Sequence, residues 1–213
     1  LAETREEVDN INKLYGSTPV VLAHKLGLFE LPVLAAHCVH LTPEEIAILA
    51  EKQVGVAHCP ESNLKLASGV APVAALLANG VQVAIGTDSA ASNNNLDMLA
   101  EMRTAALLAK GITNNPTVVP ACQALAMATL HGAVALGMDH EIGSLEAGKK
   151  ADLIMINIRQ PHLMPSHDVE ANMVYAARGS DVDTVVVNGK IIMAGGEFKT
   201  LDAEEIYYEV NKR

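Results

Sequence analysis

Residues 1–137 alternate between short, uninterrupted apolar runs and longer segments in which apolar residues recur with helical spacing. The runs are rich in small and β-branched residues and are bounded by Gly or Pro, which predicts strands buried on both faces of a sheet. They lie at residues 32–39, 55–60 and 83–85. A polar loop and a helical segment follow each run. This order predicts βα units and a parallel sheet, so the expected fold class is α/β.

Signals for helix starts support the expected helices. Thr4 with Glu7 matches a capping box, in which the Thr oxygen accepts a hydrogen bond from the Glu backbone N–H. Thr42 with Glu45 forms a second box, and Pro43 between them occupies a first helical position. We expect helices at 4–16, 42–52, 72–80 and 96–110, and one or two Ala-rich helices between 116 and 137.

Each predicted strand ends in a polar or ionisable residue, namely His37, His58 and Asp88. In a barrel of βα units the carboxyl ends of the strands form the catalytic face, so we expect these side chains at one rim. Three units cannot close an eight-fold barrel, which predicts an incomplete one. Asp88 alone is equally compatible with a helix cap.

The pattern changes after residue 138. A turn-rich link at 143–150 precedes a strand at 151–157, and residues 182–193 form a hairpin with Asn-Gly at its turn. A final helix is expected at 204–212, with Asp202 as its N-cap. We therefore divide the chain into a barrel portion, a portion of a small β domain and a C-terminal helix, at residues 1–140, 141–198 and 199–213.

Composition narrows the partners and the compartment. Half of the residues are apolar and 3% are aromatic, which suits an aliphatic α/β core rather than a nucleic-acid-binding face. The net charge of -10 argues against nucleic acids and anionic membranes as partners, and no apolar run reaches membrane-spanning length. The cysteines have no CxxC spacing, so we expect free thiols in a reducing compartment, the cytoplasm. They are Cys38, Cys59 and Cys122.

The first residues contain neither an initiator Met nor a signal-peptide pattern. They have the character of a loop that passes into a helix. We therefore expect the chain to be part of a longer polypeptide.

Three residues carry the side chains of a mononuclear, zinc-type hydrolytic site: Glu3, His37 and Asp88. Asp88 would bind the metal through an oxygen, and His37 would hold or polarise the water beside it. Glu3 would move a proton between that water and the substrate. A divalent metal lowers the pKa of bound water to about 7, so hydroxide becomes available at neutral pH. Spacing alone does not bring these residues together, because they are far apart in the sequence.

Four local motifs are more specific. They lie in order at 36–41 (Ala-His-Cys-Val-His-Leu), 58–66 (His-Cys-Pro-Glu-Ser-Asn-Leu-Lys-Leu), 86–94 (Gly-Thr-Asp-Ser-Ala-Ala-Ser-Asn-Asn) and 143–153 (Gly-Ser-Leu-Glu-Ala-Gly-Lys-Lys-Ala-Asp-Leu). Together they resemble the amidohydrolase superfamily, in the branch that deaminates 5-methylthioadenosine and S-adenosylhomocysteine and its chlorohydrolase and guanine deaminase-like relatives. The resemblance covers essentially the whole chain and corresponds to the C-terminal half of the full enzyme.

The resemblance implies the C-terminal part of a (β/α)8 TIM-like barrel plus part of a small β-sandwich. It also implies one divalent metal, zinc or alternatively iron, bound by an HxH pair, a further His and an Asp. Of these ligands only Asp88 is present, because His37 and His40 are three residues apart and belong to another motif. Glu3 matches the catalytic Glu of the family motif His-Leu-x-Glu, and His37 matches the His beside the water. We therefore expect an incomplete metal site that binds metal poorly and does not turn over without the rest of the enzyme.

The implied activity is hydrolytic deamination of an aminopurine nucleoside, a small-molecule substrate contacted by Glu3, His37 and Asp88. Water would add to the amidine carbon of the adenine ring, Glu3 would protonate the ring nitrogen, and ammonia would leave. Guanine deamination and triazine dechlorination remain alternatives. Another is a non-catalytic fragment that associates with a second copy or with its missing half. A doubly wound nucleotide-binding domain predicts a glycine-rich fingerprint after a strand, which this sequence lacks.

Other polar residues of these motifs have simpler interpretations. His40 is expected in a loop, in contact with solvent or backbone. His58 either lines the pocket or is a hydrogen-bonded structural His. Ser62 and Asn63 are expected to fix their loop rather than to touch substrate. The remaining histidines, interpreted as structural or exposed, are His24, His131, His140, His162 and His167.

Overall fold

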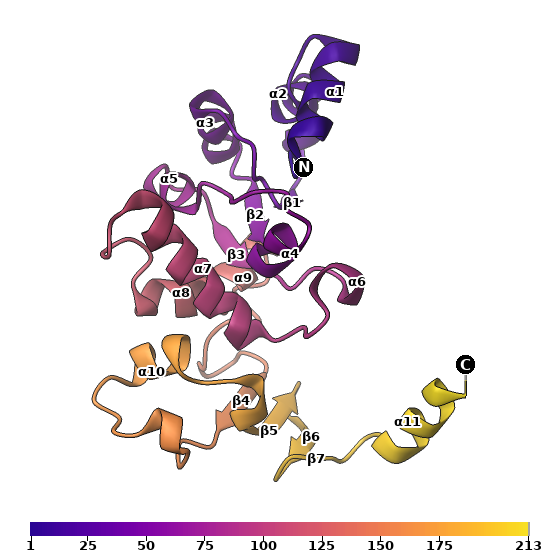
Figure 1. The fold of residues 1–213 in the computed structure, drawn as a ribbon, viewed down its shortest axis with the longest axis vertical. Coiled ribbons are helices and arrows are strands. Elements are labelled where there is room, and N and C mark those ends of the chain that lie inside the picture. The colour runs from indigo at the N-terminus through magenta and orange to yellow at the C-terminus, as the bar shows by residue number, and fades with distance from the viewer. Residues whose placement is uncertain (213) are drawn as a thin grey trace.

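The structure is a computed structural model that describes residues 1–212, and two sheets organise it (Figure 1). The first has three parallel strands, β1 (Leu34–Ala36), β2 (Gly55–His58) and β3 (Val83–Ile85), in the order β1-β2-β3. The second has four antiparallel strands, β4 (Leu153–Ile156), β5 (Val182–Val187), β6 (Lys190–Ala194) and β7 (Glu197–Phe198), also in sequence order. The prediction of parallel βα units followed by a β-rich segment is confirmed.

Helices connect the parallel strands and cover β2 and β3. The prediction of burial on both faces is wrong for β1, where Leu34 and Ala36 are exposed. The connections run through α3 (Pro43–Glu51), between β1 and β2, and through α4 (Pro60–Lys65) and α5 (Val73–Ala78), between β2 and β3. Beyond β3 lie α6 (Ala90–Asn93), α7 (Met98–Thr113), α8 (Ala121–Met127) and α9 (Leu130–Ala135). Because α5, α7, α8 and α9 all contact β3, that strand is well covered and every one of its residues is buried.

The core of this part is aliphatic, as the composition predicts. Its fully buried side chains include Leu49, Val56, Leu76, Val83 and Met102. Helix α9 approaches β2 so closely that a Cβ atom at Gly55 would lie 2.9 Å from the Cβ of Ala135. Glycine is therefore required at that point of the strand because of space.

The predicted helix caps are present. Thr42 Oγ1 accepts from the N–H of Glu45, and Glu45 Oε2 accepts in return from the N–H of Thr42, so the capping box of α3 is complete. Thr4 caps α1 (Arg5–Tyr15) by accepting from the N–H of Glu7. The other half of that box is different, because the Glu7 carboxylate accepts from two earlier N–H groups instead. After α1 come α2 (Pro19–Lys25) and the 3₁₀ helix η1 (Leu28–Glu30).

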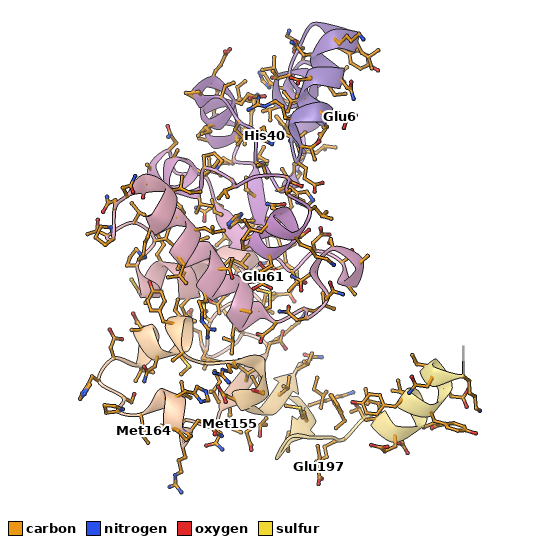
Figure 2. All side chains as sticks on the ribbon, viewed as in Figure 1. Glu6, His40, Glu61, Met155, Met164 and Glu197 are labelled. Carbon is orange, nitrogen blue, oxygen red and sulfur yellow. The ribbon has the colours of Figure 1, made fainter. Side chains whose placement is uncertain are left out.

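The antiparallel sheet lies within residues 153–198, whereas helix α10 (Val169–Tyr175), from the β4–β5 connection, packs against α7 and α8. The β5–β6 turn has Asn188 and Gly189 at positive φ, 50° and 75°, as a type I′ hairpin turn requires. Between β4 and β5 lie η2 (Pro161–Leu163), α10 (Val169–Tyr175) and η3 (Gly179–Asp181). The last helix, α11 (Ala203–Asn211), begins at the predicted cap Asp202 and stands apart from the other elements (Figure 1). Figure 2 shows Met155 and Glu197 at this sheet, whereas Glu61 lies beside α7.

Several local predictions are wrong. The strand predicted at 55–60 ends at His58. The strand predicted at 32–39 stops at Ala36, because His37 and Cys38 have positive φ angles of 70° and 51°, which end an extended strand. The polar loop predicted at 61–63 is instead part of α4, which starts at Pro60. Among residues 1–212 no helix is long and apolar enough to cross a membrane. The division at residues 140 and 198 stays a prediction.

Candidate active site

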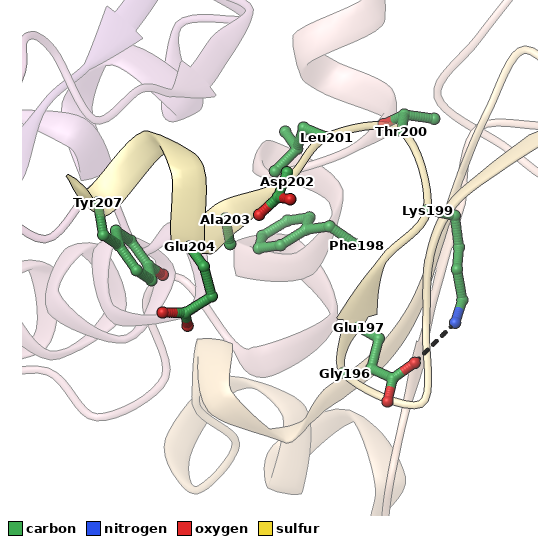
Figure 3. Close-up of a pocket in the computed structure, with 10 residues that line it drawn as sticks. All are labelled: Gly196, Glu197, Phe198, Lys199, Thr200, Leu201, Asp202, Ala203, Glu204 and Tyr207. Atoms are coloured by element: carbon green, nitrogen blue, oxygen red, sulfur yellow. Dashed lines mark hydrogen bonds and ion pairs between the residues drawn. The ribbon is translucent and has the colours of Figure 1, made fainter. Parts of the chain in front are cut away.

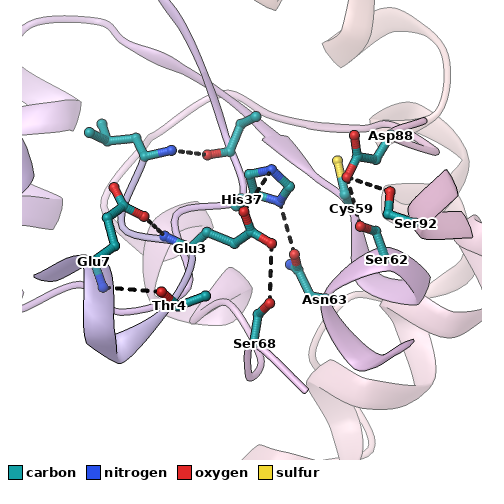
Figure 4. Close-up of polar contacts among 12 residues, drawn as sticks. Glu3, Thr4, Glu7, His37, Cys59, Ser62, Asn63, Ser68, Asp88 and Ser92 are labelled. Carbon is teal, nitrogen blue, oxygen red and sulfur yellow. Dashed lines mark hydrogen bonds and ion pairs between the residues drawn. The ribbon is translucent and has the colours of Figure 1, made fainter. Parts of the chain in front are cut away.

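The carboxyl ends of the three parallel strands gather the residues that carry the candidate chemistry (Figure 4). His37 directly follows β1, His58 is the last residue of β2, and Asp88 lies just beyond β3. Parallel neighbours place their carboxyl ends at one edge, which is the edge where α/β folds bind ligands. The positive φ angles of His37 and Asp88, 70° and 62°, turn both residues out of the strand direction at that edge.

His37 connects two of the elements. Its Nδ1 lies 2.9 Å from Oδ1 of Asn63 on α4, and its Nε2 lies 3.6 Å from Oε2 of Glu3. The two ring nitrogens of His37 thus connect the buried side chain of Asn63 with the carboxylate of Glu3.

Glu3 is held by its backbone and by its side chain. The Glu7 carboxylate accepts from the N–H groups of Ala2 and Glu3 at 2.9 and 2.8 Å, which fixes the chain just before α1. Ser68 donates from Oγ to Glu3 Oε1 at 3.1 Å. The half of the predicted capping box that is missing from α1 therefore serves to position this residue.

Asp88 accepts three hydrogen bonds. Its Oδ2 accepts from the hydroxyls of Ser62 and Ser92 at 2.7 and 2.8 Å, and its Oδ1 accepts from the N–H of Ser89 at 2.7 Å. The Ser62 and Ser92 hydroxyls hold the pKa of Asp88 below its ordinary value, against a smaller opposing effect of burial. Asp88 is therefore ionised at neutral pH, and it does not cap α7, whose N-cap is Asp97.

Helix α4 links the two ends of this arrangement. Consecutive residues of the helix, Ser62 and Asn63, contact Asp88 and His37 respectively, and both are fully buried. The structure thus brings the predicted residues Glu3, His37 and Asp88 to one rim (Figure 4).

The other two histidines of the motifs differ from each other. His40 Nε2 contacts the carbonyl oxygen of Ser68 at 2.7 Å, which confirms the predicted backbone contact. His58 is 1% exposed, and neither ring nitrogen has a hydrogen-bond partner among the described residues. Burial, with a smaller effect of His37, lowers the pKa of His58 to about 4, so the ring is neutral at pH 7. The described residues therefore supply no hydrogen-bond partner for a structural role of His58.

Asp88 is the side chain of this edge best suited to a metal. A carboxylate has about four lone-pair positions, and three accepted hydrogen bonds leave one free. A single carboxylate fits as one ligand of a shared ion but does not form a closed site. Within residues 1–212 no group of three or more His, Cys, Asp or Glu side chains is placed to hold a metal ion.

A separate hollow of about 720 Å³ lies between β7 and α11 (Figure 3). It is lined by Phe198, Glu204 and Tyr207 among others and contains none of the predicted site residues. We assign no chemistry to this hollow, because one of its walls is α11, which lies away from the other elements.

Sequence reasoning does not find the hydrogen-bond partners of the site. It predicts a loop at Ser62 and Asn63, and it does not anticipate the contacts of Ser68 and Ser92. The motif at 58–66 contains the first two residues and the motif at 86–94 contains Ser92, so a signal for these three exists. The contact of Ser68 with Glu3 joins segments that are 65 residues apart, which no local pattern reports.

A parallel βα sheet with a histidine and an aspartate at the carboxyl ends of its strands, and a glutamate beside the histidine, is an arrangement of metal-assisted hydrolases. The family assignment agrees: the chain belongs to the amidohydrolase family, whose model matches residues 1–192. A 5-methylthioadenosine/S-adenosylhomocysteine deaminase of Moorella thermoacetica is 78% identical over all 213 residues, which are 50% of that protein. The chain thus spans about half the length of the curated relatives it matches, and the predicted resemblance is confirmed.

Solved structures agree with this assignment. A zinc-bound adenosine deaminase of Xanthomonas campestris superposes with a TM-score of 0.97 and 42% identity over 99% of this chain and 48% of that one. A zinc-bound atrazine chlorohydrolase of Arthrobacter aurescens superposes with a TM-score of 0.90 and 29% identity, over 98% of this chain and 46% of that one. The predicted fold class is confirmed as a mixed α/β chain that corresponds to about half of an amidohydrolase.

Proposed function

We propose that this chain belongs to a hydrolytic deaminase of an aminopurine nucleoside of the S-adenosylhomocysteine or 5-methylthioadenosine type. The observation that carries the proposal is the convergence of Glu3, His37 and Asp88 at one rim, each held by its own hydrogen bonds. The 78% identity to a relative bearing that name supports the nucleoside as substrate.

The residues divide the chemistry as follows. When bound, a divalent metal, zinc or alternatively iron, would lower the pKa of water to about 7. Asp88, ionised and with one lone pair free, would supply one ligand to that metal. Glu3 would take a proton from the water and deliver it to the ring nitrogen next to the carbon under attack. His37, whose Nε2 faces Glu3, would hold the water at the attacking face.

The proposed reaction is a hydrolysis of the exocyclic carbon–nitrogen bond. The water oxygen forms a bond to the amidine carbon, the bond from that carbon to the exocyclic nitrogen breaks, and both water protons pass to nitrogen atoms. The products are the oxo-purine and ammonia. His58, buried and neutral, takes no proton in this scheme.

A second candidate function is displacement of chloride from a triazine, favoured by the likeness to the atrazine chlorohydrolase structure. A third is a non-catalytic fragment that needs another half, because this chain supplies one metal ligand. The compartment is proposed to be the cytoplasm, since Cys38 and Cys59 are buried free thiols and Cys122 is free and exposed.

The test is to join this chain to the N-terminal half of the Moorella thermoacetica relative, whose C-terminal half it matches at 78% identity. The hybrid, loaded with zinc, is assayed for ammonia release from S-adenosylhomocysteine, 5-methylthioadenosine and guanine, and for chloride release from atrazine. We expect the two adenine nucleosides to be the best substrates.

The variants E3Q and D88N should lower kcat by about 100-fold or more, because each removes a group that acts in the chemical step. A matched acid-to-amide change, E44Q, alters an exposed residue of α3 and should leave kcat unchanged. Atrazine as the best substrate would favour the second function. A hybrid that binds zinc but converts none of the four compounds would contradict deamination.

A further inference from the structure

Glu101 is a buried carboxylate that the proposed chemistry does not use. It lies on α7, is 0% exposed, and has no positively charged partner among residues 1–212. A buried charge without a counter-ion is costly, and a Leu or Met would fill the same place in the core at no such cost. The position therefore requires a reason other than packing.

Its two oxygens bind two different segments. Oε2 accepts from the backbone N–H of Glu61 on α4 at 3.2 Å. Oε1 accepts from the side-chain amide of Asn93 at the end of α6, and Asn93 in turn accepts through Oδ1 from the N–H of Leu96 at 2.7 Å. Glu101 thus connects the segment that follows β2 with the segment that follows β3.

The same two segments carry the hydroxyls that hold Asp88. Ser62 is the neighbour of Glu61 on α4, and Ser92 is the neighbour of Asn93 on α6. Each serine donates to Oδ2 of Asp88, at 2.7 and 2.8 Å. The two residues that donate to Glu101 are therefore the sequence neighbours of the two serines that fix the candidate metal ligand.

We propose that Glu101 is a positioning residue that clamps α4 and α6 together and thereby sets the orientation of Asp88 toward the metal. This inference rests on the proposed function only for the identity of the metal ligand. The clamp extends to His37 as well, because its partner Asn63 is the next residue of α4 after Ser62.

The ionised form of Glu101 is the form that accepts both hydrogen bonds. Burial raises the pKa of Glu101 to about 7, with further contributions from the charges of Glu61 and Asp88 and opposition from the two hydrogen bonds. The measurements are therefore made at about pH 8, where the carboxylate is mostly ionised.

Exchanging the donor and the acceptor between residues 101 and 93 distinguishes the positioning role of Glu101 from an effect of its burial alone. In E101Q the amide can accept from Glu61, but its NH₂ group then faces the NH₂ group of Asn93. In N93D two carboxylates face each other. In the double variant E101Q/N93D the new amide donates to the new carboxylate and still accepts from Glu61, while the other oxygen of that carboxylate accepts from Leu96. All three contacts are thereby restored.

The experiment uses the zinc-loaded hybrid described above, with zinc affinity measured by competition with a chromophoric chelator and kcat and KM measured on the best substrate. Each single variant should weaken zinc binding and lower kcat by about 10- to 100-fold, because partners of metal ligands have effects of this size. KM should change less. The double variant should return to within about threefold of the parent, and E44Q should match the parent.

A parental zinc affinity in both single variants would overturn the clamp, and so would a double variant no better than the worse single variant. A lowered melting temperature with unchanged zinc affinity would show that Glu101 only stabilises the fold. A parent hybrid that binds zinc but deaminates nothing would contradict the proposed function alone, since the zinc affinities still decide the role of Glu101. A parent that binds no zinc would overturn both.

Discussion

Two carboxylates near the rim have pKa values that are shifted in opposite directions because their surroundings differ. Asp88 accepts two hydroxyl donors and a backbone N–H at the open edge of the sheet, and its pKa is lowered. Glu101 is buried beside the same segments with other negative charges nearby, and its pKa is raised to about 7. Residue type alone does not separate them, because the pKa of each carboxyl is set by its donors and its burial.

This difference predicts an effect of pH on stability. A carboxyl whose pKa is higher in the folded state than the ordinary 4.5 stabilises the fold fully below pH 4.5, and this contribution is lost as pH rises through about 7. The free energy of unfolding of the parent should therefore fall, relative to that of E101Q, between about pH 5 and about pH 8. Urea unfolding of both proteins at several pH values measures it, and curves that stay parallel would contradict the raised pKa.

At the scale of the element, the local sequence specifies most clearly where a helix begins. The Thr42 capping box is complete, and Pro43 occupies its first helical position, so three neighbouring residues specify where α3 begins. Since α3 connects β1 with β2, its start also sets where the segment after His37 leaves the rim.

Replacing Thr42 with Ala should lower the free energy of unfolding by about 1 kcal/mol, because the N–H of Glu45 loses its acceptor. Thr200, which is exposed and lies outside any helix or strand, provides the matched control, and T200A should change stability little. Equal effects of the two substitutions in chemical unfolding would show that the cap contributes nothing.

The same elements show where prediction from sequence succeeds and where it stops. Helix caps and hairpin turns depend on residues close together in the sequence. The pattern therefore correctly predicts Thr42 and Asp202 as N-caps and the Asn-Gly turn of the hairpin. It does not predict the end of β1, because the chain there depends on contacts with the first residues: the Cys38 N–H donates to the Leu1 carbonyl. The motifs contain the candidate residues His37 and Asp88, whereas Glu101 lies on α7, which carries no motif.

At the scale of the whole molecule, residues 1–212 offer Asp88 as a candidate metal ligand but no group of three or more ligand side chains. Several apolar side chains of the second sheet and last helix are exposed, among them Ile154, Ile191, Tyr207 and Val210. The candidate metal ligand and the exposed apolar side chains lie in segments that are far apart along the chain. Both agree with a chain that spans about half the length of its curated relatives, and with the proposal that further ligands complete the metal site.

Metal removal tests this directly. A metal stabilises a protein only as far as it binds the folded form, by about 4 kcal/mol when its concentration is a thousand times the Kd. Adding a chelator should leave the melting temperature of the 213-residue chain unchanged and should lower that of the zinc-loaded hybrid. Zinc that stabilises the shorter chain as strongly as the hybrid would show that the site is complete without further ligands.

The close approach of α9 to β2 makes the rim sensitive to a residue at the opposite end of the strand. A methyl group at Gly55 would meet both Cβ and Cα of Ala135, at 2.9 and 3.2 Å, so either the helix or the strand would have to move. Displacement of the strand would carry His58 and the beginning of α4 with it, since Gly55 and His58 are the two ends of one short strand. The geometry of the candidate active site therefore depends on close packing between β2 and α9 in the interior, at a position where any residue larger than glycine would displace one of them.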